Sequence, residues 1–105
     1  MKNSGVLLLL FDLPSVTLPQ KREYRKFMKY IKSVGFICLQ ESVYVKLQRT
    51  TEATQYDIED IKRNNPKEGS VMILPLTVAG FSKLTPLSGE KFDVHFFCDD
   101  LIVVE

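Results

Sequence analysis

Little in this sequence could build a nucleophilic or zinc-dependent active site. Its 105 residues include no tryptophan, one histidine and two cysteines. The cysteines, Cys38 and Cys98, form no Cys-x-x-Cys pair or Cys/His cluster, so we expect both to be reduced and to bind no zinc. The histidine, His95, stands between Val94 and Phe96 in a strand-like segment, where a structural role is favoured over a catalytic one.

Long apolar stretches and nucleotide-binding motifs are also missing. The longest apolar run, Val6 to Phe11, is far shorter than the roughly 20 residues of a membrane-spanning helix, and it lacks the cleavage region of a signal peptide. Neither a P-loop nor a dinucleotide-binding glycine motif occurs. We therefore expect a cytoplasmic protein that makes no membrane contact.

The composition is that of one ordinary globular domain. The chain is 45% hydrophobic and 26% charged, which excludes collagen-like and largely disordered proteins. A domain of this length encloses one shallow core and hardly a deep pocket for a large ligand. Its function is therefore expected at a surface or at a dimer interface.

The formal net charge of +1 hides an uneven distribution of charge. Residues 21–32 carry a net charge of +5, because only Glu23 opposes six cations, and residues 90–105 carry a net charge of −4. The cations are Lys21, Arg22, Arg25, Lys26, Lys29 and Lys32. This basic stretch is the part of the chain that could contact a polyanion.

The same basic stretch has the spacing of an amphipathic helix. Apolar residues recur three or four positions apart from Tyr24 to Val34, and Gly35 follows as a C-terminal cap. Arg22, Arg25, Lys29 and Lys32 fall on the side opposite the apolar stripe. Two interpretations remain open here, a solvated helix face and a surface that binds nucleic acid.

The remaining segments alternate between strand and helix patterns. Val6 to Phe11 reads as a central strand that ends at Asp12. Residues 36–47 are too long for one strand and are expected to divide at Gln40–Glu41–Ser42, by a turn or by a bulge, into strands 36–39 and 43–47. Residues 51–64 are predicted to be helical. Residues 71–76 form a strand that Pro75 confines to a strand end or a sheet edge.

The C-terminal quarter is harder to place. Residues 80–89 are expected to be a loop with a short extended piece around Phe81. Residues 92–96 and 101–104 read as two strands that are too apolar to remain in water, so they need a partner sheet. Asp99–Asp100 between them favours a turn over a metal site.

This order predicts an α+β fold, a ferredoxin-like βαββαβ sandwich with both helices on one face of an antiparallel sheet. We expect residues 1–80 to form that core and residues 81–105 to form an extension, within a single domain. The extra C-terminal strands would complete a sheet across the interface of a homodimer.

Asp12 is the most distinctive polar residue, because it ends a strand whose other residues are apolar. One interpretation is an Asx turn leading into Pro14. The other is a Mg²⁺ ligand, since Mg²⁺ takes one or two carboxylates with waters and phosphate oxygens, and a two-fold axis would supply a second Asp12.

Several motifs together resemble the small CRISPR-associated endoribonuclease family, the second core protein of spacer acquisition. They are Phe11-Asp12-Leu13-Pro14 after an apolar strand, the basic run from Lys21 to Phe27, Gly35-Phe36-Ile37, and Gln40-Glu41-Ser42-Val43-Tyr44, and they look most like members from type II systems. The resemblance covers about residues 5–80. It implies a ferredoxin-like homodimer that bridges two dimers of the adaptation integrase and helps to hold duplex prespacer DNA. In a type II system, the effector nuclease is a further candidate partner.

The resemblance also implies a Mg²⁺-dependent endonuclease activity, on RNA or on DNA, that some members show. By position, Asp12 matches the metal-binding catalytic aspartate, and Phe11, Ser42 and Tyr44 match residues near that site. Lys21, Arg22 and Arg25 match the basic start of the first helix, and we add Lys29 and Lys32 as nucleic-acid contacts.

Alternative functions on the same fold remain open. They are a scaffold that binds DNA and keeps Asp12 as a relic, an RNA-binding module, and a toxin-like ribonuclease. The sequence has no RNP1-like aromatic run, which lowers the RNA-binding alternative. We favour the adaptation subunit.

Overall fold

The computed structural model describes residues 5–89. The elements follow one another as β1 (Gly5–Asp12), α1 (Leu18–Ser33), β2 (Ile37–Gln40), β3 (Val43–Gln48), α2 (Thr51–Arg63), β4 (Ser70–Thr77) and α3 (Val78–Phe81). The predicted βαββαβ order is confirmed, with α3 as an addition. The predicted strands 92–96 and 101–104, with His95, Cys98 and Asp99–Asp100, lie outside the described residues.

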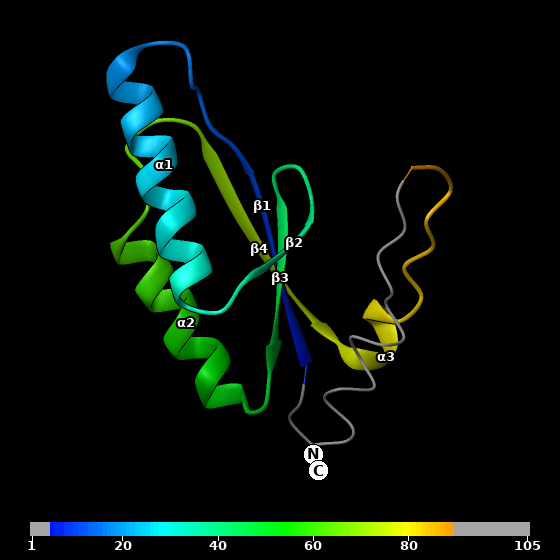
Figure 1. The fold of residues 1–105 in the computed structure, drawn as a ribbon. Helices are drawn as coiled ribbons and strands as arrows, with labels where there is room; N and C mark the ends of the chain where they lie inside the picture. The colour runs from blue at the N-terminus through cyan, green and yellow to red at the C-terminus, as the bar shows by residue number, and fades with distance from the viewer. Residues whose placement is uncertain (1–4, 90–105) are drawn as a thin grey trace.

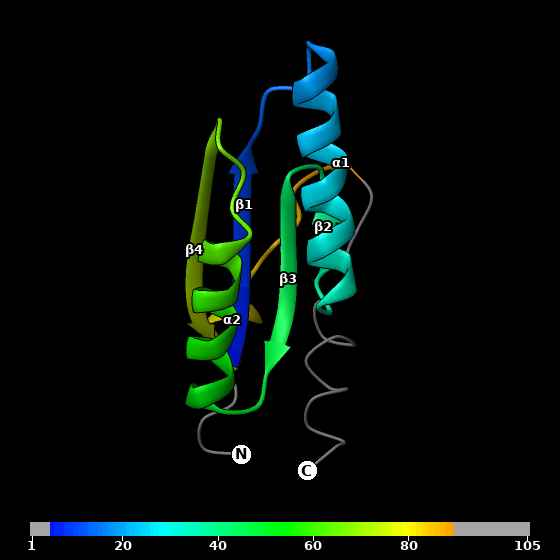
Figure 2. The same ribbon diagram turned by 90° about the vertical axis from the view of Figure 1, so that its left-hand side faces the viewer.

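The four strands form one antiparallel sheet in the order β2-β3-β1-β4. Both α1 and α2 cover the same face of this sheet, as Figures 1 and 2 show. This arrangement confirms the ferredoxin-like fold. Strand β4, which carries Pro75, is an edge strand, as expected because a proline cannot donate a ladder hydrogen bond. None of the helices within residues 5–89 is long and apolar enough to cross a bilayer.

The central strand β1 is buried on both faces, which explains its continuous apolar sequence. Leu7, Leu9 and Phe11 pack under the helices with a core that also contains Phe27, Ile31, Phe36 and Ile61. Val6 packs on the opposite face with Val45 and Phe81. Full burial of an aliphatic or aromatic side chain contributes about 1.5–3 kcal/mol, so the layer under the helices is the main source of stability.

Helix α1 ends just before Gly35, as predicted, and it begins at a capping box that the sequence analysis did not predict. The Thr17 hydroxyl accepts a hydrogen bond from the Gln20 backbone N–H, and the Gln20 side chain accepts one from the Thr17 backbone N–H, which together form a capping box. Val34 is the C-cap, and Gly35 follows with a φ of 104°. Glycine adopts this left-handed conformation without strain.

The predicted division of residues 36–47 is also confirmed, and it combines both expected devices. A turn at residues 41–42 connects β2 to β3, with Ser42 at a φ of 67°. The pairing register shifts between Cys38 and Gln40, which marks an irregularity in the same hairpin. Ser42 therefore occupies a conformation that glycine or asparagine more often supplies.

The prediction of a short extended piece around Phe81 is wrong. Phe81 is the last residue of α3, a helical turn in which the Thr77 side chain caps the backbone N–H of Gly80. Phe81 is buried against Val6 and Val45. The cap and this burial outweigh the loop-like composition of the segment, since tertiary packing routinely overrides local propensity.

Two polar clusters attach α2 to its neighbours. Asp57 accepts a hydrogen bond from Gln48 at 2.7 Å and pairs with Lys46 at 2.9 Å, which ties α2 to β3. Asp60 accepts a hydrogen bond from the Tyr30 hydroxyl and pairs with Arg63 at 3.0 Å. The hydrogen bond from Tyr30 thus joins α1 to α2, and its acceptor is the titratable carboxylate of Asp60.

Replacing Tyr30 with phenylalanine should make the free energy of unfolding decrease less as the pH falls into the acid range. The Tyr30 hydroxyl, and then Arg63, hold the pKa of Asp60 below its ordinary value of 3.8. A carboxyl whose folded-state pKa is lowered adds stability above its unfolded pKa, and this stability is lost as the pH falls through the folded value. Urea midpoints at about pH 7 and across the interval below about pH 4 would measure the effect. Tyr56→Phe, on an exposed side chain of α2, should leave the pH profile unchanged, and an unaltered profile in Tyr30→Phe would contradict the assignment.

Candidate functional site

Asp12 lies at the end of β1, where its backbone pairs with Ser70 of β4. The side chain is exposed. Within residues 5–89 its carboxylate forms no hydrogen bond and no ion pair, so the alternative of an Asx turn is not what the structure shows. No group in the described part of the chain therefore competes with a ligand for this carboxylate.

The backbone around Asp12 is held in place by the loop before β4. Gly69 has a φ of 94°, and a Cβ atom built there would lie 2.6 Å from the Asp12 carbonyl oxygen and 2.8 Å from a methyl carbon of Leu13. Such contacts are impossible without movement of the chain. The absence of a side chain at residue 69 therefore allows the loop to pack directly against Asp12.

The aromatic neighbours of Asp12 lie on the other face of the sheet. Phe11 stacks on Tyr44 with 5.8 Å between ring centroids and meets Phe27 edge-on at the same distance. Burial, and then the neighbouring Cys38, raise the pKa of Tyr44, so its hydroxyl stays protonated at neutral pH. Phe11 and Tyr44 thus belong to the core under the helices, and they pack against β1 and β3 on the face opposite Asp12.

Ser42, by contrast, is close to the end of β1. Its carbonyl oxygen accepts a hydrogen bond from the backbone N–H of Phe11 at 3.1 Å. This bond holds the β2–β3 turn beside the strand end that carries Asp12. Ser42 thus contacts Phe11, the residue before Asp12, through its backbone.

One copy of the chain offers a single carboxylate at this site. No group of three or more His, Cys, Asp or Glu side chains that could hold a metal exists in the described part of the chain. Mg²⁺ is satisfied by one or two carboxylates when waters and phosphate oxygens supply the rest. The donor chemistry of Asp12 therefore fits Mg²⁺, and a second Asp12 would give the more complete set.

The predicted basic residues all lie on α1 and are exposed. The buried residues of the helix, Phe27 and Ile31, face the sheet. None of the cations forms an ion pair with a residue in the range 5–89. They are Lys21, Arg22, Arg25, Lys26, Lys29 and Lys32. The outer side of α1 is thus a row of positive charges that no carboxylate of the described chain neutralises.

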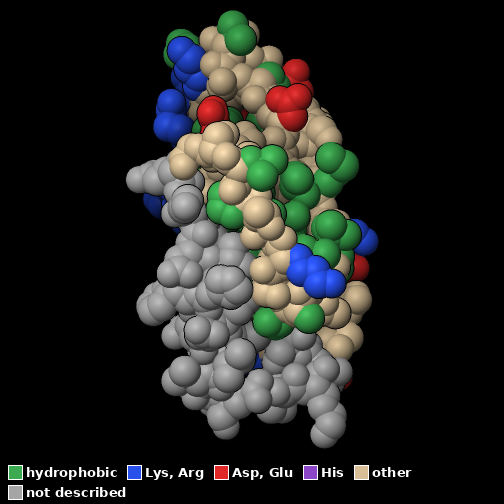
Figure 3. Space-filling view, turned by 90° about the vertical axis from the view of Figure 1, so that its right-hand side faces the viewer, with side chains coloured by type: hydrophobic (Ala, Val, Ile, Leu, Met, Phe, Trp, Pro, Cys, Tyr) green, Lys and Arg blue, Asp and Glu red, His purple; other side chains and the backbone are tan. Residues whose placement is uncertain are grey.

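The face of the sheet opposite α1 and α2, here called the open face, is apolar and partly exposed. Hydrophobic side chains gather across it in Figure 3, with acidic side chains at one end. Met72, Leu74 and Ile37 on its strands are 61%, 48% and 43% exposed. By the alternation of side chains along β1, Asp12 shares this face with Leu8 and Leu10. Sequence analysis missed the exposed positions of β4, although their spacing of two residues was a signal.

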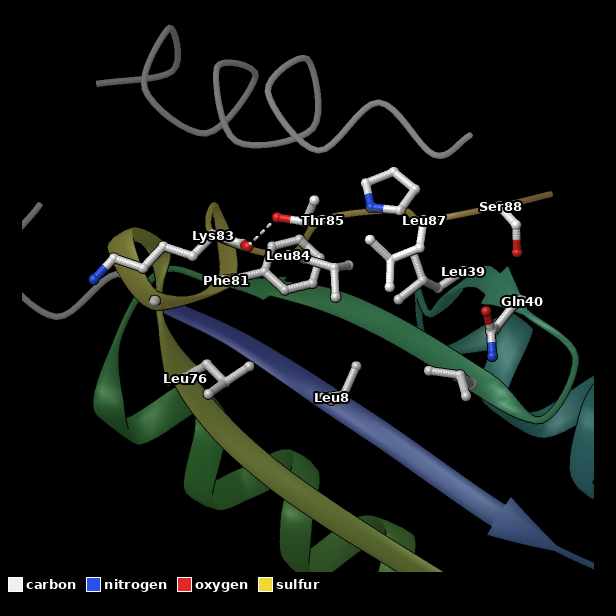
Figure 4. A pocket seen from close by; sticks show the side chains of 13 residues that line it. Leu8, Leu39, Gln40, Leu76, Phe81, Lys83, Leu84, Thr85, Leu87 and Ser88 are labelled. Atoms are coloured by element: carbon white, nitrogen blue, oxygen red, sulfur yellow. Dashed lines mark hydrogen bonds between the residues drawn. The ribbon is translucent and has the colours of Figure 1, made fainter. Parts of the chain in front are cut away.

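A cavity of about 670 Å³ opens on this face. Figure 4 shows Leu8, Leu39 and Leu76 of the sheet opposite the segment that carries Phe81, Leu84 and Leu87. Leu84 and Leu87 are 45% and 93% exposed. Within residues 5–89, the segment after α3 therefore crosses the open face without filling the space beneath it, which leaves apolar surface there that another protein surface could cover.

Comparison with known proteins places these features in a family. The family model described as CRISPR associated protein Cas2 matches residues 6–84. The chain belongs to the Cas2 family. The match includes Asp12, the basic row on α1, α3 and all of the sheet except Gly5 at the start of β1, whereas Leu87 at the rim of the large cavity lies beyond it.

Individual Cas2 relatives support this assignment along most of the chain. A protein from Streptococcus mutans serotype c (strain UA159) named CRISPR-associated endoribonuclease Cas2 is 40% identical over 85 residues, covering 81% of this chain and 78% of its own length. Proteins with the same name from Treponema denticola and Lacticaseibacillus rhamnosus are 33% and 31% identical, and each match covers 93% of this chain and 97% or 98% of the relative. The similarity therefore extends beyond residues 6–84.

Proposed function

We propose that this Cas2 family member is an adaptation subunit, a homodimer that bridges the CRISPR integrase and helps to hold prespacer DNA. The observation that carries the proposal is the row of cations on α1, none of which forms an ion pair with residues 5–89. Such a row binds duplex DNA through its phosphates, without regard to sequence. Family membership supplies the biological setting, and the type II effector nuclease is a further proposed partner.

The dimensions of the row suit a nucleic-acid backbone. From Lys21 to Lys32 the helix rises about 16 Å at 1.5 Å per residue. Phosphates of one strand advance about 3.4 Å along the duplex axis, so the row spans about five of them. Because α1 lies on the outer layer (Figure 2), a duplex can approach it without displacing any part of residues 5–89.

Reversing two charges of this row should weaken DNA binding and reduce its salt dependence. Lys29→Glu with Lys32→Glu should reduce the slope of log affinity against log salt by about 2, since each neutralised phosphate contributes about 0.9. Fluorescence anisotropy with a labelled duplex between about 50 and 200 mM salt would measure both effects.

A matched variant distinguishes an effect of the α1 cations on DNA affinity from an effect of the net charge of the protein. Lys62→Glu with Lys67→Glu makes the same change in net charge on exposed side chains outside α1. It should retain most of the affinity and nearly the full salt slope. Equal losses in the two variants would favour a merely solvated helix face.

The homodimer is proposed to form through the open face. The exposed Met72 and Leu74 and the cavity beside Leu8 offer apolar surface that a second copy would remove from water. Asp12 projects from the same face, so two copies packed there about a two-fold axis would bring two Asp12 side chains to one interface.

The nuclease activity is proposed from the relatives and from the chemistry of Asp12. Relatives are named endoribonucleases, and the free carboxylate of Asp12 can hold Mg²⁺ together with its counterpart in the second copy. Bound Mg²⁺ would supply charge stabilisation at a phosphate. The chain's own part is to fix the Asp12 backbone through Gly69 and Ser42 and to hold the substrate phosphates on α1, with RNA or DNA as the substrate class.

A further inference from the structure

A second, smaller cavity lies at the end of the molecule where β1 meets α1. It has a volume of about 200 Å³ and lies between the start of α1 and the loop that leads into β4. Three prolines and one aromatic ring line it, namely Pro14, Pro19, Pro66 and Tyr24. We call it the proline-tyrosine pocket.

Two walls of the proline-tyrosine pocket are held by contacts within the chain. Pro19 lies in the first turn of α1, next to the capping box of Thr17 and Gln20. Tyr24 packs edge-on against Phe11, with 6.5 Å between ring centroids. The pocket therefore exists before any ligand arrives, which lowers the entropic cost of binding.

The charge at the rim favours a cationic ligand. Glu23 and Glu68 both line the pocket, and neither forms an ion pair with any residue of the described chain. Lys67 is the one cation among the lining residues, so the rim carries a net negative charge. A Lys or Arg side chain would find here a carboxylate that has no ion-pair partner within residues 5–89.

Two exposed apolar residues lie close in the chain to a lining residue of the pocket. Val16 and Leu18, which precede Pro19 in the chain, are 84% and 66% exposed. Large apolar side chains beside a preformed pocket are typical of a surface that contacts protein. Together with the acidic rim they indicate a protein segment rather than a small metabolite.

We propose that the proline-tyrosine pocket binds an extended, proline-containing segment of a protein partner that carries Lys or Arg beside its proline. Proline-rich segments form polyproline II helices, whose rings pack against aromatic and proline side chains with little loss of conformational entropy. The small volume accepts one such ring or a leucine side chain, and Glu23 and Glu68 then select the neighbouring cation. This inference does not depend on nucleic-acid binding by α1.

The test is a titration of the full-length, isotope-labelled protein followed by NMR. The probe is the acetylated and amidated peptide Arg-Ala-Pro-Leu-Pro-Ala-Arg. We expect saturable shifts at the backbone amides of Gln20, Tyr24 and Lys67. The double variant Glu23→Gln with Glu68→Gln should reduce the affinity for the peptide by about tenfold or more, which is the effect of losing one charge-assisted hydrogen bond. It should leave the affinity of α1 for duplex DNA no weaker.

Matched controls make the outcome decisive. Glu52→Gln with Glu59→Gln changes the same charges on exposed positions of α2 and should leave peptide affinity unchanged. The same peptide with glutamate in place of arginine should not bind. Shifts that map to the open face or to the basic side of α1, equal binding of the acidic peptide, or no saturable shift at millimolar peptide would each overturn the proposal.

Discussion

Asp12→Asn is expected to reduce metal-dependent cleavage by orders of magnitude while the fold and the dimer persist. The change keeps the shape of the side chain and removes one negative charge from each copy, so the charge that attracts Mg²⁺ disappears. The carboxylate is exposed and forms no bond with the described chain, so its loss leaves no buried partner unsatisfied. Thermal unfolding should therefore show wild-type stability.

The measurement compares cleavage and integration on the same preparation of the variant. Cleavage of labelled RNA and DNA is followed with Mg²⁺ and with EDTA, and integration is reconstituted with the integrase. If the scaffold role dominates, integration should scarcely change. Cleavage that survives both Asp12→Asn and EDTA would defeat the assignment of Asp12, and loss of integration alone would place Asp12 at the partner interface.

Leu74→Asp should separate the proposed homodimer into monomers. Leu74 lies on the open face next to Leu8 across the β4–β1 ladder and is 48% exposed in the single chain. At a dimer interface each copy would bury one unpaired carboxylate, at a cost of about 3–5 kcal/mol. The dissociation constant should therefore rise more than a hundredfold, as sedimentation equilibrium would show.

The control for Leu74→Asp is Tyr56→Asp. Tyr56 is 66% exposed on α2, on the opposite side of the sheet, so the same new charge there should leave the dimer intact. Circular dichroism would verify that both variants are folded. A wild-type chain that is a folded monomer at micromolar concentration, or a dimer that tolerates Leu74→Asp, would rule out the open face as the interface.

The elements predicted from sequence are those whose pattern is local. A continuous apolar run identified β1, the period-3.6 repeat identified α1, and helical composition identified α2, and each of these signals lies within the segment itself. The extended piece at Phe81 was wrong because the burial of Phe81 against Val6 and Val45 depends on residues more than 30 positions away. No local pattern contains that contact.

The sequence predicted which residues belong to the candidate site, but it did not predict how they lie relative to one another. Asp12 stood out as a carboxylate at the end of an apolar strand, and the cations of α1 stood out by their spacing. That Phe11 and Tyr44 support the strand from the opposite face follows from the register of β1 and β3, which one sequence does not specify. The resemblance identified the neighbours of Asp12, and the structure shows that Ser42 forms a backbone hydrogen bond with Phe11, the residue before Asp12.

Gly69 packs so closely against Asp12 that the site requires a residue without a side chain at position 69. Any larger residue would clash with the Asp12 carbonyl oxygen and with Leu13. It would therefore displace the Asp12 carboxylate without binding any ligand itself. A selection for chains that fold but cannot cleave should therefore recover changes at two positions 57 residues apart. Only one of them carries a functional group, so a search for reactive side chains alone would overlook the other.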